Sequence, residues 1–341
     1  MECNRHHSCR CLATTLLLAI SILSPSCSKK ASLNEAAFVL PEQLKLRNST
    51  AQASRVVAEL KGSDRVIITE RANADDGTLW SNVNGPDGKS GWAEARYFVK
   101  EGIVLESRRI AEQVKDIQTQ AVGRSKATLK LRLTPDRSND DNVATMLSSG
   151  TLLEIVGRER KPRPLTSGIE SESETSTGKS SGKPNEVKYD DWLLVRLKDY
   201  AVLPAGWIYG GSVGLEIPSE IVYFSSTGRR ITGWHKIATL TGDDSKTGEH
   251  YLVLERKIFG VDDQVDFDRV KVLAYDPVSR NYSTPFREDI SGRFPLTLKM
   301  SGTRGQFQID VLDKDKQIHP ITYNIEMLEG GRVKVTRAGK K

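Results

Sequence analysis

Alternating apolar and polar positions run through most of the chain and predict short β-strands. The tetrapeptide Leu-Lys-Leu-Arg occurs at residues 44–47 and again at 129–132, and an apolar run follows each copy, at 65–69 and at 152–156. Such runs, bounded by turn-forming residues, are typical of strands. Each copy then continues with a tryptophan in a further apolar run and with a Gly-Trp pair. Because several elements recur in the same order, we predict a duplicated small β-domain.

Between the two copies the apolar residues follow helical spacing. They lie seven, four, three and four positions apart among Glu, Arg, Lys and Gln, which is the period of an amphipathic helix. We expect this helix to pack against one or both flanking β-domains. Its apolar positions are Ile103, Ile110, Val114, Ile117 and Ala121.

These patterns place a first β-domain at 41–100, a linker helix at 101–125 and a second β-domain at 126–220. The second β-domain carries an insertion at 158–189 that is rich in Ser, Thr, Gly, Lys, Glu and Pro and has no aromatic residue before Tyr189. A segment with so little to bury cannot offset its ordering entropy. We therefore predict a disordered insertion, tolerated as a loop rather than used for binding.

A third unit at 221–338 has strand-like runs at short intervals and no copy of the repeat. Turn clusters separate these runs, which predicts a C-terminal all-β domain, either a sandwich or a small barrel made of hairpins. The fold class is therefore mainly β. The runs lie at 251–255, 269–275, 307–311 and 321–325.

The N-terminal segment predicts export. Basic residues precede an apolar run at 12–23, which is shorter than the roughly 20 residues of a membrane-spanning helix but matches the hydrophobic region of a signal peptide. We assign 1–26 to the signal peptide and 27–40 to a tether.

The end of the signal peptide, Ser-Pro-Ser-Cys at 24–27, resembles a bacterial lipoprotein signal, in which the cysteine becomes the acylated first residue. The resemblance implies Cys27 as the lipidation site, and Ser28 after it implies the outer membrane. Leu23 stands four places before the cysteine, whereas the lipoprotein pattern has leucine three places before it. Ordinary cleavage to a soluble periplasmic or secreted protein is therefore the alternative.

Cysteine and charge usage exclude several function classes. All four cysteines lie at or before Cys27, so the rest of the chain has no thiolate nucleophile, disulfide or cysteine zinc site. His235, His250 and His319 are the only histidines beyond the first ten residues, and their spacing is not that of metal ligands. The net charge of +6 comes from 50 basic and 44 acidic residues that are interspersed, unlike the concentrated basic face of a nucleic-acid binder. We assign no catalytic residue, metal or cofactor.

One acidic cluster at residues 262–268 contains Asp262, Asp263, Asp266 and Asp268. Carboxylate oxygens suit a hard cation, but the cluster lacks the glycine and distal glutamate of a helix-flanked calcium loop. We interpret it as a solvated turn. A pocket that gathered His235 or His250 with this cluster would instead indicate an enzyme.

The order of these motifs resembles that of bacterial SH3 (SH3b) domains. Domains of that family open with an alternating Leu-Arg strand, carry a tryptophan in a middle strand, here Trp80 and Trp192, and reach Gly-Trp before the last strand, here Trp92 and Trp207. The chain beyond them is similar to the C-terminal region of uncharacterised SH3b-containing envelope lipoproteins. The resemblance implies two SH3-like barrels joined by a helix and followed by the C-terminal β domain.

The resemblance also implies a function. SH3b domains bind peptidoglycan peptides or other envelope polymers, and the peptidase often joined to them needs a cysteine that the chain lacks after Cys27. We therefore expect a non-catalytic, envelope-anchored binding or scaffold protein whose partner is a cell-wall polymer or an envelope protein. The alternatives are a structural component of an envelope assembly with the barrels as spacers, and an enzyme with a site hidden in the C-terminal domain. The ligand and the oligomeric state stay open.

Six aromatic residues are the candidate ligand contacts. An indole offers a large apolar face with one hydrogen-bond donor, which suits a shallow groove, but a strand tryptophan in a small barrel also serves as core. The tyrosines follow the Gly-Trp pairs and are expected at a groove edge. The candidates are Trp80, Trp92, Tyr97, Trp192, Trp207 and Tyr209.

Overall fold

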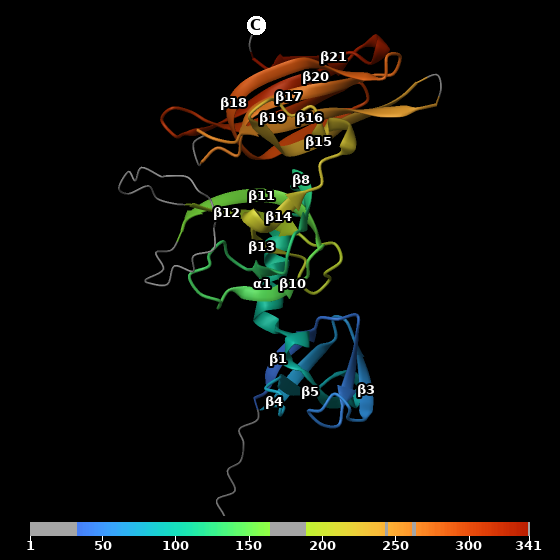
Figure 1. Cartoon of the computed structure of the whole chain (residues 1–341), viewed down its shortest axis with the longest axis vertical. Coiled ribbons are helices and arrows are strands. Elements are labelled where there is room, and N and C mark those ends of the chain that lie inside the picture. The colour runs from blue at the N-terminus through green and yellow to red at the C-terminus, as the bar shows by residue number, and fades with distance from the viewer. Residues whose placement is uncertain (1–32, 164–188, 243–244, 261–263, 340–341) are drawn as a thin grey trace, which may run out of the picture.

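The computed structural model describes residues 33–163, 189–242, 245–260 and 264–339, and within them the chain is mainly β. Three seven-stranded antiparallel sheets follow one another along the chain, and helix α1 (Glu101–Gln113) joins the first two (Figure 1). This confirms the predicted fold class. No helix in this part of the chain is long and apolar enough to span a membrane.

The first two sheets have the same strand order. It is β3-β2-β6-β5-β4-β1-β7 in the first and β10-β9-β13-β12-β11-β8-β14 in the second, the same arrangement shifted by seven strands. The first sheet contains β1 (Glu35–Val39), β2 (Gln43–Arg47), β3 (Val56–Lys61), β4 (Arg65–Asn73), β5 (Leu79–Asn84), β6 (Ser90–Glu94) and β7 (Phe98–Lys100), with 3₁₀ turns η1 (Pro86–Gly88) and η2 (Ala95–Tyr97). The second contains β8 (Ala121–Ser125), β9 (Leu129–Arg132), β10 (Val143–Leu147), β11 (Leu152–Pro162), β12 (Tyr189–Arg196), β13 (Ala205–Tyr209) and β14 (Val213–Leu215), with η3 (Gly210–Ser212).

Each of these two domains begins one strand earlier than predicted. The segment predicted as a tether at 27–40 contains β1, which pairs with β4 and β7 and contributes buried Ala37 and Val39 to the core. The predicted linker helix at 101–125 ends at Gln113, and Ala121 opens strand β8. Both strands are short and rich in small residues, so their alternation is weak in the sequence.

A side chain from the second sheet marks the end of the linker helix. The Arg196 guanidinium donates hydrogen bonds to the carbonyl oxygens of Val114, Lys115 and Ile117 at 3.0–3.1 Å. These carbonyls lie in the turn that follows the last helical residue, Gln113. The linker helix therefore ends beside the Arg196 guanidinium of the second domain.

Strand residues occupy both ends of the insertion predicted at 158–189. Strand β11 continues to Pro162 and pairs with β12 as far as Tyr189. The remainder of the predicted insertion, at 164–188, lies outside the described residues, as do the predicted signal peptide and Cys27.

The third domain is a single antiparallel meander in which consecutive strands are always neighbours. It curls around a main core that includes Phe267, Phe307 and Tyr323. A second, smaller cluster contains Ile221, Ile231, Tyr251, Val253 and Leu273. Its strands are β15 (Arg229–Thr241), β16 (Thr247–Lys257), β17 (Phe267–Asp276), β18 (Asn281–Ser301), β19 (Arg304–Leu312), β20 (Ile318–Met327) and β21 (Val333–Arg337), with the short helix α2 (Ser219–Val222) before them and η4 (Glu329–Gly331) before β21.

Two glutamine side chains attach the second domain to the third. The Gln120 amide donates to the Leu296 carbonyl at 3.0 Å and accepts from the Leu296 N–H at 2.8 Å. Gln118 makes the same pair of bonds with Leu298, both at 2.7 Å. The Gln120 backbone also receives the Trp234 N–H and donates to Ile155. The segment 118–120 therefore contacts both domains.

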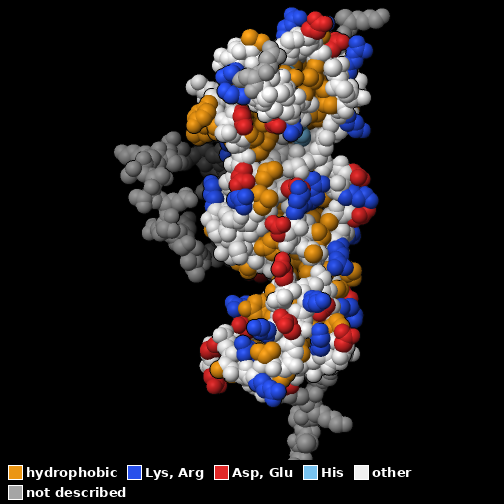
Figure 2. Space-filling model, turned by 90° about the vertical axis from the view of Figure 1, so that its right-hand side faces the viewer, with side chains coloured by type: hydrophobic (Ala, Val, Ile, Leu, Met, Phe, Trp, Pro, Cys, Tyr) orange, Lys and Arg blue, Asp and Glu red, His pale blue; other side chains and the backbone are white. Residues whose placement is uncertain are grey.

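Figure 2 shows the three domains as one column. Acidic and basic side chains are interspersed on the face in view.

Each Gly-Trp pair needs its glycine because the backbone of a neighbouring strand passes close to it. Gly91 has a positive φ of 152°, and a Cβ there would lie 2.8 Å from the Arg47 carbonyl oxygen. Gly206 in the second domain would meet the Arg132 carbonyl oxygen at the same distance. The repeated Leu-Arg strand therefore passes directly over the repeated glycine.

Gly91→Ala should destabilise the first domain by about 2 kcal/mol or more, because the new methyl group meets backbone rather than a flexible side chain. Gly102→Ala is the control, since nothing lies within 4 Å of a Cβ at that helical position, and it should be neutral or stabilising by up to about 1 kcal/mol. Urea unfolding of both variants checks this. Equal stability of the two variants would contradict the close-approach explanation.

Candidate functional site

The strand registers show which residues of the two domains are equivalent. Trp80 on β5 pairs with Glu94, and Trp192 on β12 pairs with Tyr209. Trp80 therefore corresponds to Trp192, and Glu94 corresponds to Tyr209. The same registers match Trp92 with Trp207, since each pairs with the strand-end arginine of its own domain.

Trp80 and Trp192 are buried but stand apart from the main cores. Their exposed fractions are 3% and 2%, yet neither belongs to the principal apolar cluster of its domain. Trp80 instead shares a face of the sheet with Glu94, because directly paired residues point the same way. A buried indole outside the core is available to form the floor of a surface concavity.

Such a concavity exists in the first domain. A groove of about 460 Å³ lies between β2, β6 and η2, and Trp80 and Tyr97 line it. The rest of the lining combines apolar Pro41, Leu44 and Ala93 with polar residues that the sequence did not indicate as contacts. These include Lys45, Arg47, Gln52, Glu94 and Arg96.

The groove contains one nearly buried carboxylate. Glu94 is 7% exposed, and its two oxygens receive the Gln52 amide at 3.2 Å and the Arg96 guanidinium at 2.7 Å. Arg96 also donates to the Tyr97 hydroxyl at 3.1 Å and lies 5.0 Å from the centre of that ring. The only sequence signal for Glu94 is its position two residues after Trp92, which places both on one face of the strand.

Arg47 stabilises the loop beside the groove. Its guanidinium donates to the Ser54 carbonyl at 2.6 Å, and the equivalent Arg132 donates to the Asn139 carbonyl at 2.7 Å, in both cases seven residues further on. The arginine of each Leu-Arg strand is thus a framework residue, and Arg47 also lines the groove of the first domain.

The corresponding place in the second domain is filled. Tyr209, where the first domain has Glu94, packs edge-on against Trp192 with ring centres 6.2 Å apart. Arg137 covers Tyr209 at 5.3 Å and forms an ion pair with buried Asp190 at 2.6 Å. The two domains therefore share a framework, and the first one presents an open groove at this position.

The remaining candidates lie elsewhere. Trp92 and Trp207 are half-buried, and Trp92 is not among the residues that line the groove. Tyr97 and Tyr209 are not equivalent, because Tyr209 corresponds to Glu94. The structure thus brings Trp80 and Tyr97 together in one domain and Trp192 and Tyr209 in the other.

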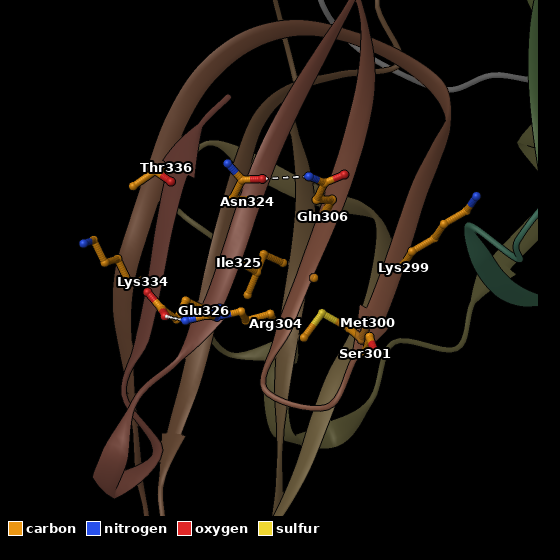
Figure 3. Close-up of a pocket in the computed structure, with 11 residues that line it drawn as sticks. Lys299, Met300, Ser301, Arg304, Gln306, Asn324, Ile325, Glu326, Lys334 and Thr336 are labelled. Atoms are coloured by element: carbon orange, nitrogen blue, oxygen red, sulfur yellow. Dashed lines mark hydrogen bonds and ion pairs between the residues drawn. The ribbon is translucent and has the colours of Figure 1, made fainter. Parts of the chain in front are cut away.

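A concavity of about 600 Å³ in the third domain is lined by a self-paired polar ladder (Figure 3). The Gln306 amide donates to the Asn324 side-chain oxygen at 2.9 Å, and Arg304 forms an ion pair with Glu326 at 3.1 Å. No aromatic side chain lines it. Lys299, Lys334 and Thr336 also line it, so its charged groups are mainly cationic.

The acidic cluster and the histidines do not meet among the described residues. His235 lines a different cavity with Trp234, and the buried His250 accepts the Tyr275 N–H at 2.9 Å. Asp266 is not a solvated turn residue, since it is 4% exposed and accepts hydrogen bonds from Arg158 and from the Phe294 N–H. An ion pair and a backbone donor offset its burial.

The other members of the acidic cluster give no metal site in the part of the chain that is described. Asp268 forms an ion pair with Arg229, and Asp262 and Asp263 lie outside that part. No group of three or more His, Cys, Asp or Glu side chains in the described ranges could hold a metal ion.

No protein-family model matches this chain, and no curated protein sequence matches it. The groove of the first domain is therefore the structural basis for a proposed function.

His235→Leu should reduce the acid sensitivity of the fold. Burial lowers the pKa of His235 from 6.5 to about 4, so between these values the unfolded chain binds a proton that the folded chain does not. Stability is therefore lost as the pH falls from 6.5 to 4, by about 3 kcal/mol in total from this group. Urea unfolding at pH 7.5 and 5.0 measures the loss, and a variant that loses as much stability as the wild type would contradict the assignment.

Proposed function

We propose that this chain is a non-catalytic, envelope-anchored binding protein whose first barrel binds peptide segments of the cell wall. The observation that supports this most directly is the open groove over Trp80 in the first domain, at a place that Tyr209 and Arg137 occupy in the second. A duplicated framework with one open and one filled copy is expected when one domain binds and the other has a structural role.

The chemistry of the groove suits a peptide that carries both amino and carboxylate groups. Tyr97 offers an apolar face above the buried Trp80, and the Glu94 carboxylate can accept a hydrogen bond from an ammonium group. Lys45 and Arg47 in the same lining can pair with carboxylates. Cell-wall peptides combine these groups along a short extended chain.

The proposed anchor fits this arrangement. Five residues lie between Cys27 and Leu33, where the described chain begins, and a fully extended chain spans at most about 20 Å from one to the other. A lipid on Cys27 would therefore hold the first barrel near the membrane. The third domain would then project away along the column, since it lies at the far end (Figure 1).

A structural role in an envelope protein assembly is the second candidate. The glutamine pairs of Gln118 and Gln120 join the second and third domains into one unit that could present a fixed surface to a protein partner. Crosslinking in membranes separates the two functions, because this candidate requires one dominant protein partner and no retention on isolated cell wall.

Glu94→Gln and Tyr97→Ala should each weaken binding of cell-wall peptides to the full mature chain by about tenfold or more, the effect of about 1.4 kcal/mol. Glu94→Gln removes the charge but keeps an acceptor for the Gln52 amide, so the fold should be retained. Calorimetric titration with purified wall peptides and retention on isolated cell wall measure the loss.

Tyr223→Ala is the matched control, since this tyrosine is 90% exposed and lies outside the groove, and it should bind like the wild type. Absence of wild-type binding, or full binding by both groove variants, would reject the proposal.

A further inference from the structure

A cavity at the junction of the second and third domains is lined mainly by apolar side chains. Its volume is about 630 Å³, and it opens between the segment 118–122 and the strands β15, β16 and β18. Val122, Ile237, Leu298 and Met300 are among the apolar residues that line it. An apolar cavity with a few polar groups is the usual form of a site for a small ligand.

The walls of this cavity are held in place by bonds between the two domains. The Gln118 amide is bonded to both backbone groups of Leu298, and the Trp234 N–H donates to the Gln120 carbonyl at 3.0 Å. Trp234 is half-buried and packs against apolar clusters of both domains. The cavity is therefore formed before a ligand binds, and a preformed site loses less entropy on binding.

The charged side chains of the lining are paired with each other. Lys236 on β15 and Glu249 on β16 form an ion pair at 3.0 Å, and the Tyr251 hydroxyl donates to the same carboxylate. No other Lys, Arg, Asp or Glu of the described chain lines the cavity. Burial lowers the pKa of His235 to about 4, so this ring is uncharged at neutral pH. A charged ligand would lose its water here without gaining an unpaired counter-charge.

His235 contributes a buried polar ring without a partner. It lines the cavity and is 7% exposed. Neither ring nitrogen makes a hydrogen bond with a residue that the structure describes, and Nε2 has no contact with solvent. Nδ1 is therefore the ring nitrogen left to bind a group in the cavity. Because buried polar groups in native proteins are nearly always hydrogen-bonded, such a ring indicates a missing partner.

We propose that this cavity binds one unit of an uncharged saccharide, with Trp234 and His235 as its main contacts. A sugar ring has an apolar C–H face that can pack against the indole, and hydroxyl groups that can bond to the imidazole. The indole N–H of Trp234 makes no hydrogen bond within the described part of the chain, so it can donate to a sugar oxygen. A purely apolar ligand would leave both rings without a hydrogen-bond partner.

The test is calorimetric titration and saturation-transfer NMR of the full mature chain with neutral trisaccharides of glucose, of mannose, of galactose and of N-acetylglucosamine. At least one of the four should bind saturably and should raise the temperature of thermal unfolding. Absence of saturable binding by all four would overturn the proposal. The groove variant Glu94→Gln should bind the same trisaccharide like the wild type, which separates this result from the proposed wall-peptide binding.

His235→Leu should weaken trisaccharide binding at least tenfold at pH 7.5, while the ligand-free protein stays as stable as the wild type or becomes more stable, because a buried ring without a partner becomes apolar. His319→Leu is the matched control, since it changes an exposed histidine of the same domain outside the cavity, and it should keep the full affinity. Trp234→Phe keeps an aromatic ring between the domains but removes the indole N–H, and it should also weaken binding severalfold. Unchanged binding by His235→Leu and Trp234→Phe, or loss of stability in ligand-free His235→Leu, would overturn the site.

Discussion

The architecture depends on the pairing of two glutamine side chains with the backbone of one strand. Gln120 is fully buried, and its amide gives and receives a hydrogen bond at the same peptide unit of Leu296. A buried amide is costly unless its donor and acceptor are both satisfied, and a satisfied one excludes other arrangements. Because Gln118 repeats the contact at Leu298, the two domains are fixed in both position and angle. The ion pair of Arg158 with Asp266 and the Trp234 N–H bond to the Gln120 carbonyl add to this attachment.

The same kind of constraint operates inside each small domain. The close approach of the Leu-Arg strand to the glycine of the Gly-Trp pair fixes how β2 crosses β6, and how β9 crosses β13. With that crossing fixed, the residue three positions after the glycine points at the buried tryptophan of the neighbouring strand. A glutamate at this position leaves an open groove with a charge in it, and a tyrosine closes the groove. The residue at this position, together with Arg137 in the second domain, therefore accounts for the open groove in one copy and its absence in the other.

The sequence predicts what depends on local pattern. The alternating runs, the Gly-Trp pairs and the hairpins of the third domain all appear where periodicity and turn residues place them. The strands β1 and β8 were missed because short runs of small residues gain their stability from neighbours on both sides rather than from their own alternation. Glu94 was missed for a related reason, since only the pairing of β5 with β6 brings it to Trp80. The linker helix was predicted too long because the cation that ends it, Arg196, is distant in sequence.

The junction shows why such contacts lie beyond sequence reasoning. Arg158 and Asp266 are about a hundred residues apart in the sequence, and only the attachment of the second domain to the third brings them together. A buried arginine between two carboxylates gives little net stability compared with apolar packing, because desolvation cancels most of the attraction. The bridge that Arg158 forms between Asp191 and Asp266 therefore does more to fix which residues of the two domains face each other than to add stability, because a different arrangement would leave Arg158 or Asp266 buried without its partner.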